Sequence, residues 1–137
     1  FIEDNKLDTF KRELDKHVEK YCNELEFKQE LFSYRIESSW LSLFQKNSYG
    51  HIHDHGSSDI SGVYYHKTNG DDGSIFFVSP APSSSRPVQI CNTRLTYPPI
   101  TGGLILFPGW LRHGIETNTT DNIRISLSFN YQFDRNK

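Results

Sequence analysis

The sequence predicts a mainly β fold with one N-terminal supporting helix, of the barrel-like or sandwich type. Two observations predict it: an apolar repeat of three and four residues near the start, and then short alternating segments separated by turns. The 137 residues suit one domain with one core, spanning 1–137, and no linker or internal repeat divides them. Aromatic residues form 14% of the sequence, so a compact core can be built from few large side chains.

The helix is predicted over residues 7–25, because apolar side chains mark one face there and charged residues occupy the others. Another helical turn or two is expected around 26–32. Strands are predicted over 39–45, 49–55, 60–66, 74–78, 104–107 and 122–133. The Asn-Gly-Asp-Asp-Gly turn at 69–73 is predicted to close a β-hairpin. Residues 79–101 are predicted to be mostly loop with one short strand, and we expect this loop to border the pocket.

The charge of the chain gives no reason to expect nucleic acid or a membrane as a partner, and its cysteines bear on its location. The net charge is −2 and no block of like charge occurs, so neither nucleic acid nor a membrane is an expected partner. The chain shows no membrane-spanning apolar run and no signal peptide. Cys22 and Cys91 lie far apart and form no CxxC motif, so two reduced thiols are expected, with a disulfide between them as the alternative. These features predict a cytoplasmic protein.

Three of the six histidines stand in His-Ile-His-Asp-His, residues 51–55. Alternate side chains of a strand share a face, so His51, His53 and His55 are expected on one face and Asp54 on the other. Two imidazoles two residues apart can occupy adjacent positions around one metal ion. Imidazole suits iron, zinc, copper and nickel, so the pattern does not choose among them. An exposed polar strand end without metal is the alternative interpretation.

Two further segments carry candidate site residues. His113 follows the apolar strand 104–107 and is the candidate third ligand, with a surface loop histidine as the alternative. In the last strand, Arg124 and Ser126 lie two residues apart on one face, where a guanidinium and a hydroxyl can meet one carboxylate. A half-exposed strand shows similar alternation, but the small hydroxyl residues on this face are more typical of a polar cup.

Four motifs stand in this order: Ser-Trp-Leu at 39–41, His-Asp-His-Gly-Ser-Ser-Asp-Ile-Ser-Gly-Val-Tyr-Tyr at 53–65, Leu-Phe-Pro-Gly-Trp-Leu-Arg-His at 106–113 and Arg-Ile-Ser-Leu-Ser-Phe-Asn at 124–130. Together they resemble the Fe(II)/2-oxoglutarate-dependent oxygenases. More narrowly, they are similar to phage and bacterial members of mostly unassigned substrate, related to prolyl 4-hydroxylases. The resemblance implies a double-stranded β-helix (jelly-roll, cupin-like), with Fe(II) and 2-oxoglutarate as cofactors and ascorbate as reductant.

The resemblance also implies the metal ligands. His53 and His113 match the two histidines of the family's metal triad. The usual first motif is His-x-Asp, and this chain departs from it by placing His55 where the carboxylate would stand. The expected ligands are therefore His53, His55 and His113, with Asp54 as the alternative carboxylate, which strand alternation turns away from the metal. No catalytic side chain is implied beyond the metal site.

The co-substrate contacts are implied in the same way. Arg124 would bind the distal carboxylate of 2-oxoglutarate, assisted by Ser126. Tyr65 matches a tyrosine that touches this carboxylate in prolyl hydroxylases, whereas Tyr64 is expected to face the other side of its strand. Four aromatic residues can supply apolar walls, although packing in the core is the stronger expectation for each: Trp40, Phe44, Phe76 and Trp110.

The implied activity is hydroxylation of a peptidyl or small-molecule substrate, with release of succinate and CO2. The expected partners are the small-molecule co-substrate and an unidentified protein or small-molecule substrate. Two other functions stay open. One is a three-histidine, cupin-type dioxygenase that does not use 2-oxoglutarate, and the other is a non-catalytic metal-binding β domain.

Overall fold

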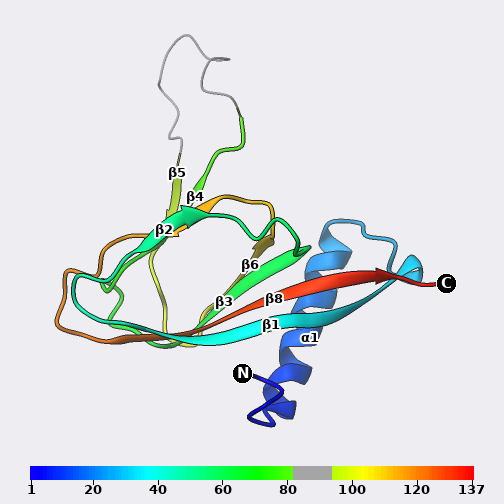
Figure 1. Ribbon diagram of the computed structural model, residues 1–137, viewed down its shortest axis with the longest axis horizontal. Helices are drawn as coiled ribbons and strands as arrows, with labels where there is room; N and C mark the ends of the chain where they lie inside the picture. The colour runs from blue at the N-terminus through cyan, green and yellow to red at the C-terminus, as the bar shows by residue number, and fades with distance from the viewer. Residues whose placement is uncertain (82–93) are drawn as a thin grey trace.

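A computed structural model describes residues 1–81 and 94–137. In chain order its elements are α1 (Asp8–Glu24), η1 (Gln29–Leu31), β1 (Phe32–Phe44), β2 (Gly50–His53), β3 (Ile60–Lys67), β4 (Ile75–Val78), β5 (Arg94–Tyr97), β6 (Leu104–Pro108), β7 (His113–Ile115) and β8 (Arg124–Arg135). The strands form two four-stranded antiparallel sheets, ordered β1-β8-β3-β6 and β2-β7-β4-β5. The sheets face each other as the two layers of a jelly roll (Figure 1). The predicted fold class is confirmed.

Strand β8 directs one set of side chains towards the buried cluster under helix α1 (Asp8–Glu24) and the other set into the space between the two sheets. It is paired on one side with β1, from Phe32↔Arg135 to Phe44↔Arg124, and on the other side with β3. Its apolar residues Leu127, Phe129 and Tyr131 join one buried cluster. Because strand side chains alternate in direction, Arg124 and its polar successors point the other way, between the sheets.

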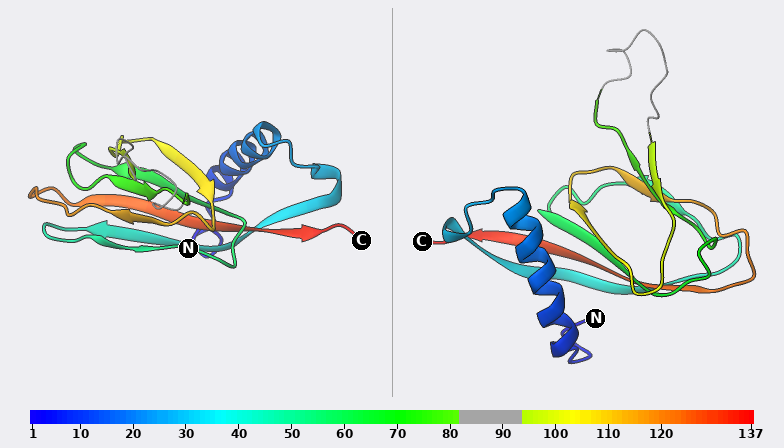
Figure 2. Two further views of the ribbon diagram at one scale, coloured as in Figure 1. Left: turned by 90° about the horizontal axis from the view of Figure 1, so that it is seen from above. Right: turned by 180° about the vertical axis from the view of Figure 1, so that it is seen from behind.

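Helix α1 packs on the outer face of the first sheet, behind β1 and β8 in Figure 1 and in front of them in the rear view of Figure 2. Its buried residues Leu14, Val18 and Cys22 recur every four positions, as the amphipathic pattern predicted. Burying each large apolar side chain contributes about 1.5–3 kcal/mol. The hydroxyl of Tyr131 also donates to Asp15 Oδ1 at 2.6 Å, so the helix is fixed to β8 by a polar contact as well.

Two expectations about the strands were wrong. The turn at 69–73 does not close a hairpin, because β3 and β4 belong to different sheets and the turn carries the chain from one layer to the other. The first strand begins at Phe32 and not at 39, because β8 extends far enough to pair with these earlier residues. The helical turn expected around 26–32 is the short η1.

Several sequence predictions concern features that the structure does not test. No helix in the described ranges has both the length and the hydropathy needed to cross a membrane. Single-domain organisation and cytoplasmic location stay predictions. Of the loop predicted over 79–101, residues 82–93, with Cys91, lie outside the described residues. Its one short strand is β5, which pairs with β4.

Candidate functional site

Three histidines from separate points of the chain converge between the sheets. The possible ligand atoms of His53, His55 and His113 all lie within 4.8 Å of one another. His53 ends β2 and His113 begins β7, and these two residues are paired directly across the strands. His55 follows β2, and its backbone N–H donates to the carbonyl of Gly109 at 2.8 Å. The separations suit three ligands of one metal ion.

The main chain orients two of the three imidazole rings. Nδ1 of His53 lies 2.7 Å from the carbonyl oxygen of His51, and Nδ1 of His113 lies 2.9 Å from that of Leu111. A carbonyl can only accept, so each Nδ1 carries the hydrogen. The Nε2 lone pair of each ring is therefore free for a metal ion.

Burial keeps the imidazoles of His55 and His113 uncharged. It lowers the pKa of His113 to about 4, an effect that the hydrogen bond to Leu111 opposes and the charge of His53 reinforces. Burial also lowers the pKa of His55, and the nearby His53 adds to this shift. At neutral pH these two rings are thus neutral and can donate a lone pair to a metal.

One expectation about the histidine motif was wrong. Strand β2 ends at His53 and its pairing with β7 is irregular after Gly50, so the single strand face expected for residues 51, 53 and 55 is interrupted. His53 and His55 still lie together, as expected, with ring centroids 4.9 Å apart. His51 is exposed, and its ring packs edge-on against Tyr49 with centroids 4.8 Å apart. Asp54 is exposed and outside the group of three, which His55 completes.

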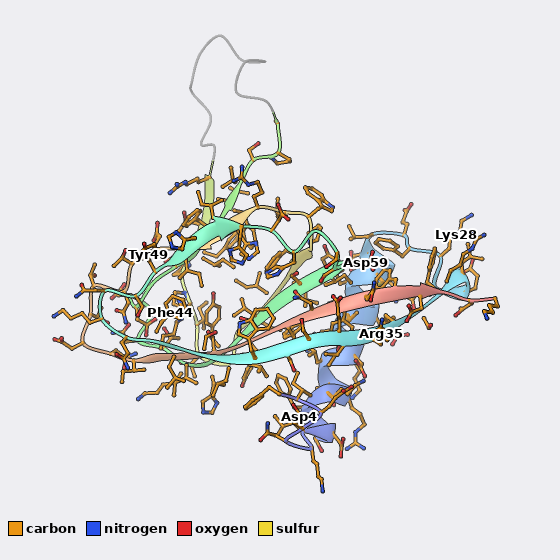
Figure 3. All side chains as sticks on the ribbon, viewed as in Figure 1. Asp4, Lys28, Arg35, Phe44, Tyr49 and Asp59 are labelled. Carbon is orange, nitrogen blue, oxygen red and sulfur yellow. The ribbon has the colours of Figure 1, made fainter. Side chains whose placement is uncertain are left out.

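A cavity of about 170 Å³ adjoins the three histidines and is lined by residues from both sheets. In Figure 3 side chains from both layers point into the space between them, and Phe44 and Tyr49 are labelled at either end of the β1–β2 connection. Trp40 and Phe44 line the cavity, as expected. Phe76 does not line it and is buried, in agreement with the alternative of core packing. Trp110 is 58% exposed, so both interpretations of this residue were wrong.

Arg124 lines the same cavity and is only 1% exposed. Its Nη1 donates to the carbonyl of Gly73, and its guanidinium lies over the ring of Phe44 at 4.3 Å. Its Nε and Nη2 are buried with no hydrogen-bond partner in the part of the chain that the structure describes. Buried donors without a partner cost free energy, and this pair of N–H groups has the geometry that binds a carboxylate with two parallel hydrogen bonds.

Electrostatics at Arg124 favour an anionic ligand. Burial lowers the pKa of Arg124, while Tyr65 and Asp72 oppose the shift. A guanidinium still keeps its charge at neutral pH. A buried charge with two unused donors costs free energy, and binding of a carboxylate reduces that cost.

The two residues expected to assist Arg124 lie near it. Tyr65 and Ser126 are both buried and are paired directly between β3 and β8. Tyr65 lines the cavity, and burial raises its pKa to about 12, so its hydroxyl remains a donor. Ser126 does not line the cavity. Tyr64 faces the other way, with its ring 5.1 Å from that of Phe10 in α1.

Sequence analysis missed the polar residues that brace the cavity at Arg124. Asp72 and Asn118 are both 0% exposed. The Asn118 amide donates to the carbonyls of Phe44 at 3.1 Å and Asn122 at 2.7 Å, so it ties β1 to the β7–β8 loop. The available signal was an Asp-Gly pair in a turn and an Asn followed by two threonines, since such side chains often bind nearby backbone groups.

Comparisons with known proteins agree with this geometry. A family model described as "Putative 2OG-Fe(II) oxygenase" matches residues 38–130, which is more than half of the chain. A search of curated proteins found no match. Among solved structures, a 2OG-Fe(II) oxygenase family oxidoreductase from Burkholderia pseudomallei is similar, at 20% identity and a TM-score of 0.61. The alignment covers 77% of this chain and 48% of that one.

Two other solved structures are similar to this chain. The alpha ketoglutarate dependent epimerase SnoN from nogalamycin biosynthesis is 18% identical, with a TM-score of 0.58 over 72% of this chain and 47% of that one. HygX from Streptomyces hygroscopicus with nickel and 2-oxoglutarate bound is 14% identical, with a TM-score of 0.55 over 72% and 56%. The chain spans about half the length of these structures, and likeness at such identity shows the fold.

The donor set fits the cofactors that the family match implies. Three neutral imidazoles can hold Fe(II), and a buried guanidinium with two unused N–H groups can hold the far carboxylate of 2-oxoglutarate. On the match over residues 38–130, the chain belongs to the 2OG-Fe(II) oxygenase family, whose cofactors are Fe(II) and 2-oxoglutarate.

Proposed function

We propose that the chain is an Fe(II)- and 2-oxoglutarate-dependent oxygenase that hydroxylates a peptidyl or small-molecule substrate and releases succinate and CO2. One observation carries the proposal: the unpartnered Nε and Nη2 of Arg124 border the same cavity as the three histidines. A three-histidine site that does not use 2-oxoglutarate needs no buried guanidinium with two unused donors. The same feature disfavours a metal-binding domain without catalysis.

The metal and co-substrate, when bound, supply the oxidising chemistry that turns 2-oxoglutarate and dioxygen into succinate and CO2 with one oxygen atom passed to the substrate. The residues of the chain bind and orient. His53, His55 and His113 would hold the metal through nitrogen lone pairs. Backbone carbonyls keep these available at His53 and His113, and burial does so at His55 and His113. Arg124 would hold the co-substrate by its far carboxylate, and Tyr65 would donate its hydroxyl to the same group.

Apolar walls would keep water out of the cavity. Phe44 covers one face of the guanidinium and Trp40 lies beside His55, with ring centroids 6.0 Å apart. Excluding water from this side strengthens the hydrogen bonds between Arg124 and a carboxylate.

The cavity volume bears on the substrate. About 170 Å³ is small beside the roughly 300–1,000 Å³ of pockets that enclose drug-sized ligands. With the co-substrate bound, only a small group of the substrate would enter, which suits one side chain of a peptide or the edge of a small molecule. The proposed kinship with phage and bacterial relatives of prolyl 4-hydroxylases adds peptidyl proline as a candidate.

Conversion of 2-oxoglutarate to succinate, measured with Fe(II), ascorbate and dioxygen, tests the proposal. This uncoupled reaction often proceeds without the true substrate, so the substrate need not be known. Wild type should form succinate, and Arg124→Ala and His113→Ala should not. Metal binding without succinate under any condition would favour the non-catalytic domain. Dioxygen consumption that is unchanged by omitting 2-oxoglutarate would favour the cupin-type dioxygenase.

A further inference from the structure

Arg124 is held by a turn that crosses between the sheets. The turn, residues 68–73, follows β3 and leads into β4, and its last residue accepts a hydrogen bond from Arg124 Nη1. Gly73 has a φ of +106°, and a Cβ there would lie 2.6 Å from the carbonyl oxygen of Glu116 and 3.3 Å from Arg124 Nη1. Only glycine brings this carbonyl so close to the guanidinium.

Asp72 fixes the shape of that turn from inside. Its Oδ1 accepts from the hydroxyl of Thr68, and its Oδ2 accepts from the backbone N–H of Asn69 at 2.9 Å. Oδ2 also accepts from the Asn122 amide at 2.6 Å, which connects the turn to the segment that leads into β8. The carboxylate is 0% exposed, so each of these bonds forms away from water.

The hydrogen bond from Arg124 to Gly73 leaves one edge of the guanidinium for a ligand. Gly73 takes Nη1, and the ring of Phe44 lies against the guanidinium face. The remaining donors, Nε and Nη2, form the planar edge that matches a carboxylate. Because the Gly73 carbonyl holds Nη1, a shift of the 68–73 turn would remove one of the contacts that fix the direction of this edge.

We propose that Asp72 is a positioning residue for co-substrate binding: by holding the Gly73 carbonyl against Arg124, it directs the Nε–Nη2 edge at the distal carboxylate of a 2-oxo dicarboxylic acid. This inference rests on the proposed function. Asp72 touches neither metal nor co-substrate and acts through Arg124. Nothing in the family match over residues 38–130 assigns this role.

The charge of Asp72 and its hydrogen bonds have opposite effects on carboxylate binding at Arg124, and we expect the effect of the hydrogen bonds to be larger. A nearby negative charge by itself weakens the binding of a second anion. The charge of Asp72 is already bound by three donors, whereas its loss would release both the turn and the Asn122 segment. In Asp72→Asn at least one of the three bonds is lost: either the NH2 group faces the donors of Asn69 and Asn122, or it faces Thr68, whose hydroxyl already accepts from Gly70 N–H and then has no acceptor for its own hydrogen. The net result is a weaker grip on the distal carboxylate.

The experiment compares two keto acids on the full chain loaded with Mn(II), by calorimetric titration without dioxygen. 2-Oxoglutarate carries the distal carboxylate and 2-oxobutyrate lacks it, so the ratio of their affinities isolates the contribution of Arg124. Asp72→Asn should lower this ratio about tenfold by weakening 2-oxoglutarate binding, while 2-oxobutyrate binds as before. The neighbouring exposed Asp71→Asn is the matched control and should keep the wild-type ratio.

Each outcome decides one point. An equal loss of affinity for both acids would mean a merely structural role and would overturn the inference, as would an unchanged or higher ratio. If Asp72→Asn does not fold, Asn122→Ala removes only the 2.6 Å bond and should lower the ratio about threefold. Arg124→Ala separates the two proposals. If it keeps the wild-type ratio the proposed function fails, and if it lowers the ratio while Asp72→Asn does not, only this inference fails.

Discussion

The metal end of the cavity and the end at Arg124 are built in different ways. The histidines come from β2, the segment after it and β7, and their exposure ranges from exposed His53 to buried His113. Arg124 comes from β8 in the other sheet and is fully buried, with loops on both sides. One end offers neutral lone pairs near the surface, and the other offers a positive charge in the interior.

This difference shows how one small cavity can bind two unlike partners. A metal ion needs several ligands whose lone pairs are free, and local backbone bonds at His53 and His113 provide that. A carboxylate needs a donor pair whose direction is fixed. At Arg124 that direction depends on the hydrogen bond to the Gly73 carbonyl and on packing against the ring of Phe44. The metal end should therefore fail by loss of a ligand, and the Arg124 end by loss of orientation.

The largest effect is expected at the metal end. His113→Ala removes a buried ligand and should weaken Mn(II) binding by more than about 100-fold, beyond the effect of losing a supporting partner. His51→Ala is the matched control, because His51 lies in β2 two residues before His53 yet outside the group of three, and it should change affinity less than about twofold. Titration with Mn(II) measures both. Equal effects of the two substitutions would contradict the assignment of the ligands.

His55→Asp sharpens the contrast in charge between the two ends. Three neutral ligands leave the site one unit more positive than two imidazoles and a carboxylate. One charge at contact distance is worth on the order of 4 kcal/mol at an effective dielectric constant near 20. Wild type should therefore bind metal more tightly when dianionic 2-oxoglutarate is present. His55→Asp should bind Mn(II) about tenfold more tightly without the co-substrate and gain less from adding it.

Competition with a chelator, with and without 2-oxoglutarate, measures this coupling. His55→Gln, which removes the imidazole without adding charge, is the control and should weaken metal binding. A metal affinity of the wild type that 2-oxoglutarate does not change would show that the charge argument is wrong.

Arg124→Lys tests orientation at the other end. Lysine keeps the positive charge but not the planar donor edge, so 2-oxoglutarate should bind about tenfold more weakly while Mn(II) binding stays as in wild type. Calorimetric titration of the metal-loaded protein measures both affinities. Unchanged binding of 2-oxoglutarate would mean that charge, and not the paired donors, holds the carboxylate.

The smallest effect is expected outside the cavity. Tyr131→Phe removes the hydroxyl by which β8 donates a hydrogen bond to Asp15 of α1, and should lower the free energy of unfolding by about 1 kcal/mol. Urea unfolding of wild type and variant measures this difference. Binding of Mn(II) and 2-oxoglutarate to the folded variant should not change, because α1 packs on the sheet face opposite the cavity. A change in either affinity would show that the helix influences the site.

The metal end was the easier part to predict from sequence. Clustered histidines and a buried strand arginine are unusual residue types for their positions, and alternation correctly placed Arg124 facing the interior. Alternation does not tell which sheet a strand joins, so the turn at 69–73 was interpreted as a hairpin and the role of Asp72 was missed. Pairing between β1, β8 and β3 is long-range, and short segments carry no signal for it.

The carbonyl bonds to His53 and His113 have a consequence for how this cavity can vary. Each ring is oriented by the carbonyl of a residue two positions earlier in its own segment, so the geometry of these two ligands depends on two short segments of the chain. The side chains of the cavity wall make none of these hydrogen bonds. Wall residues that do not pack against the rings can therefore change with the molecule that has to be recognised, while the direction of these two ligands stays as it is.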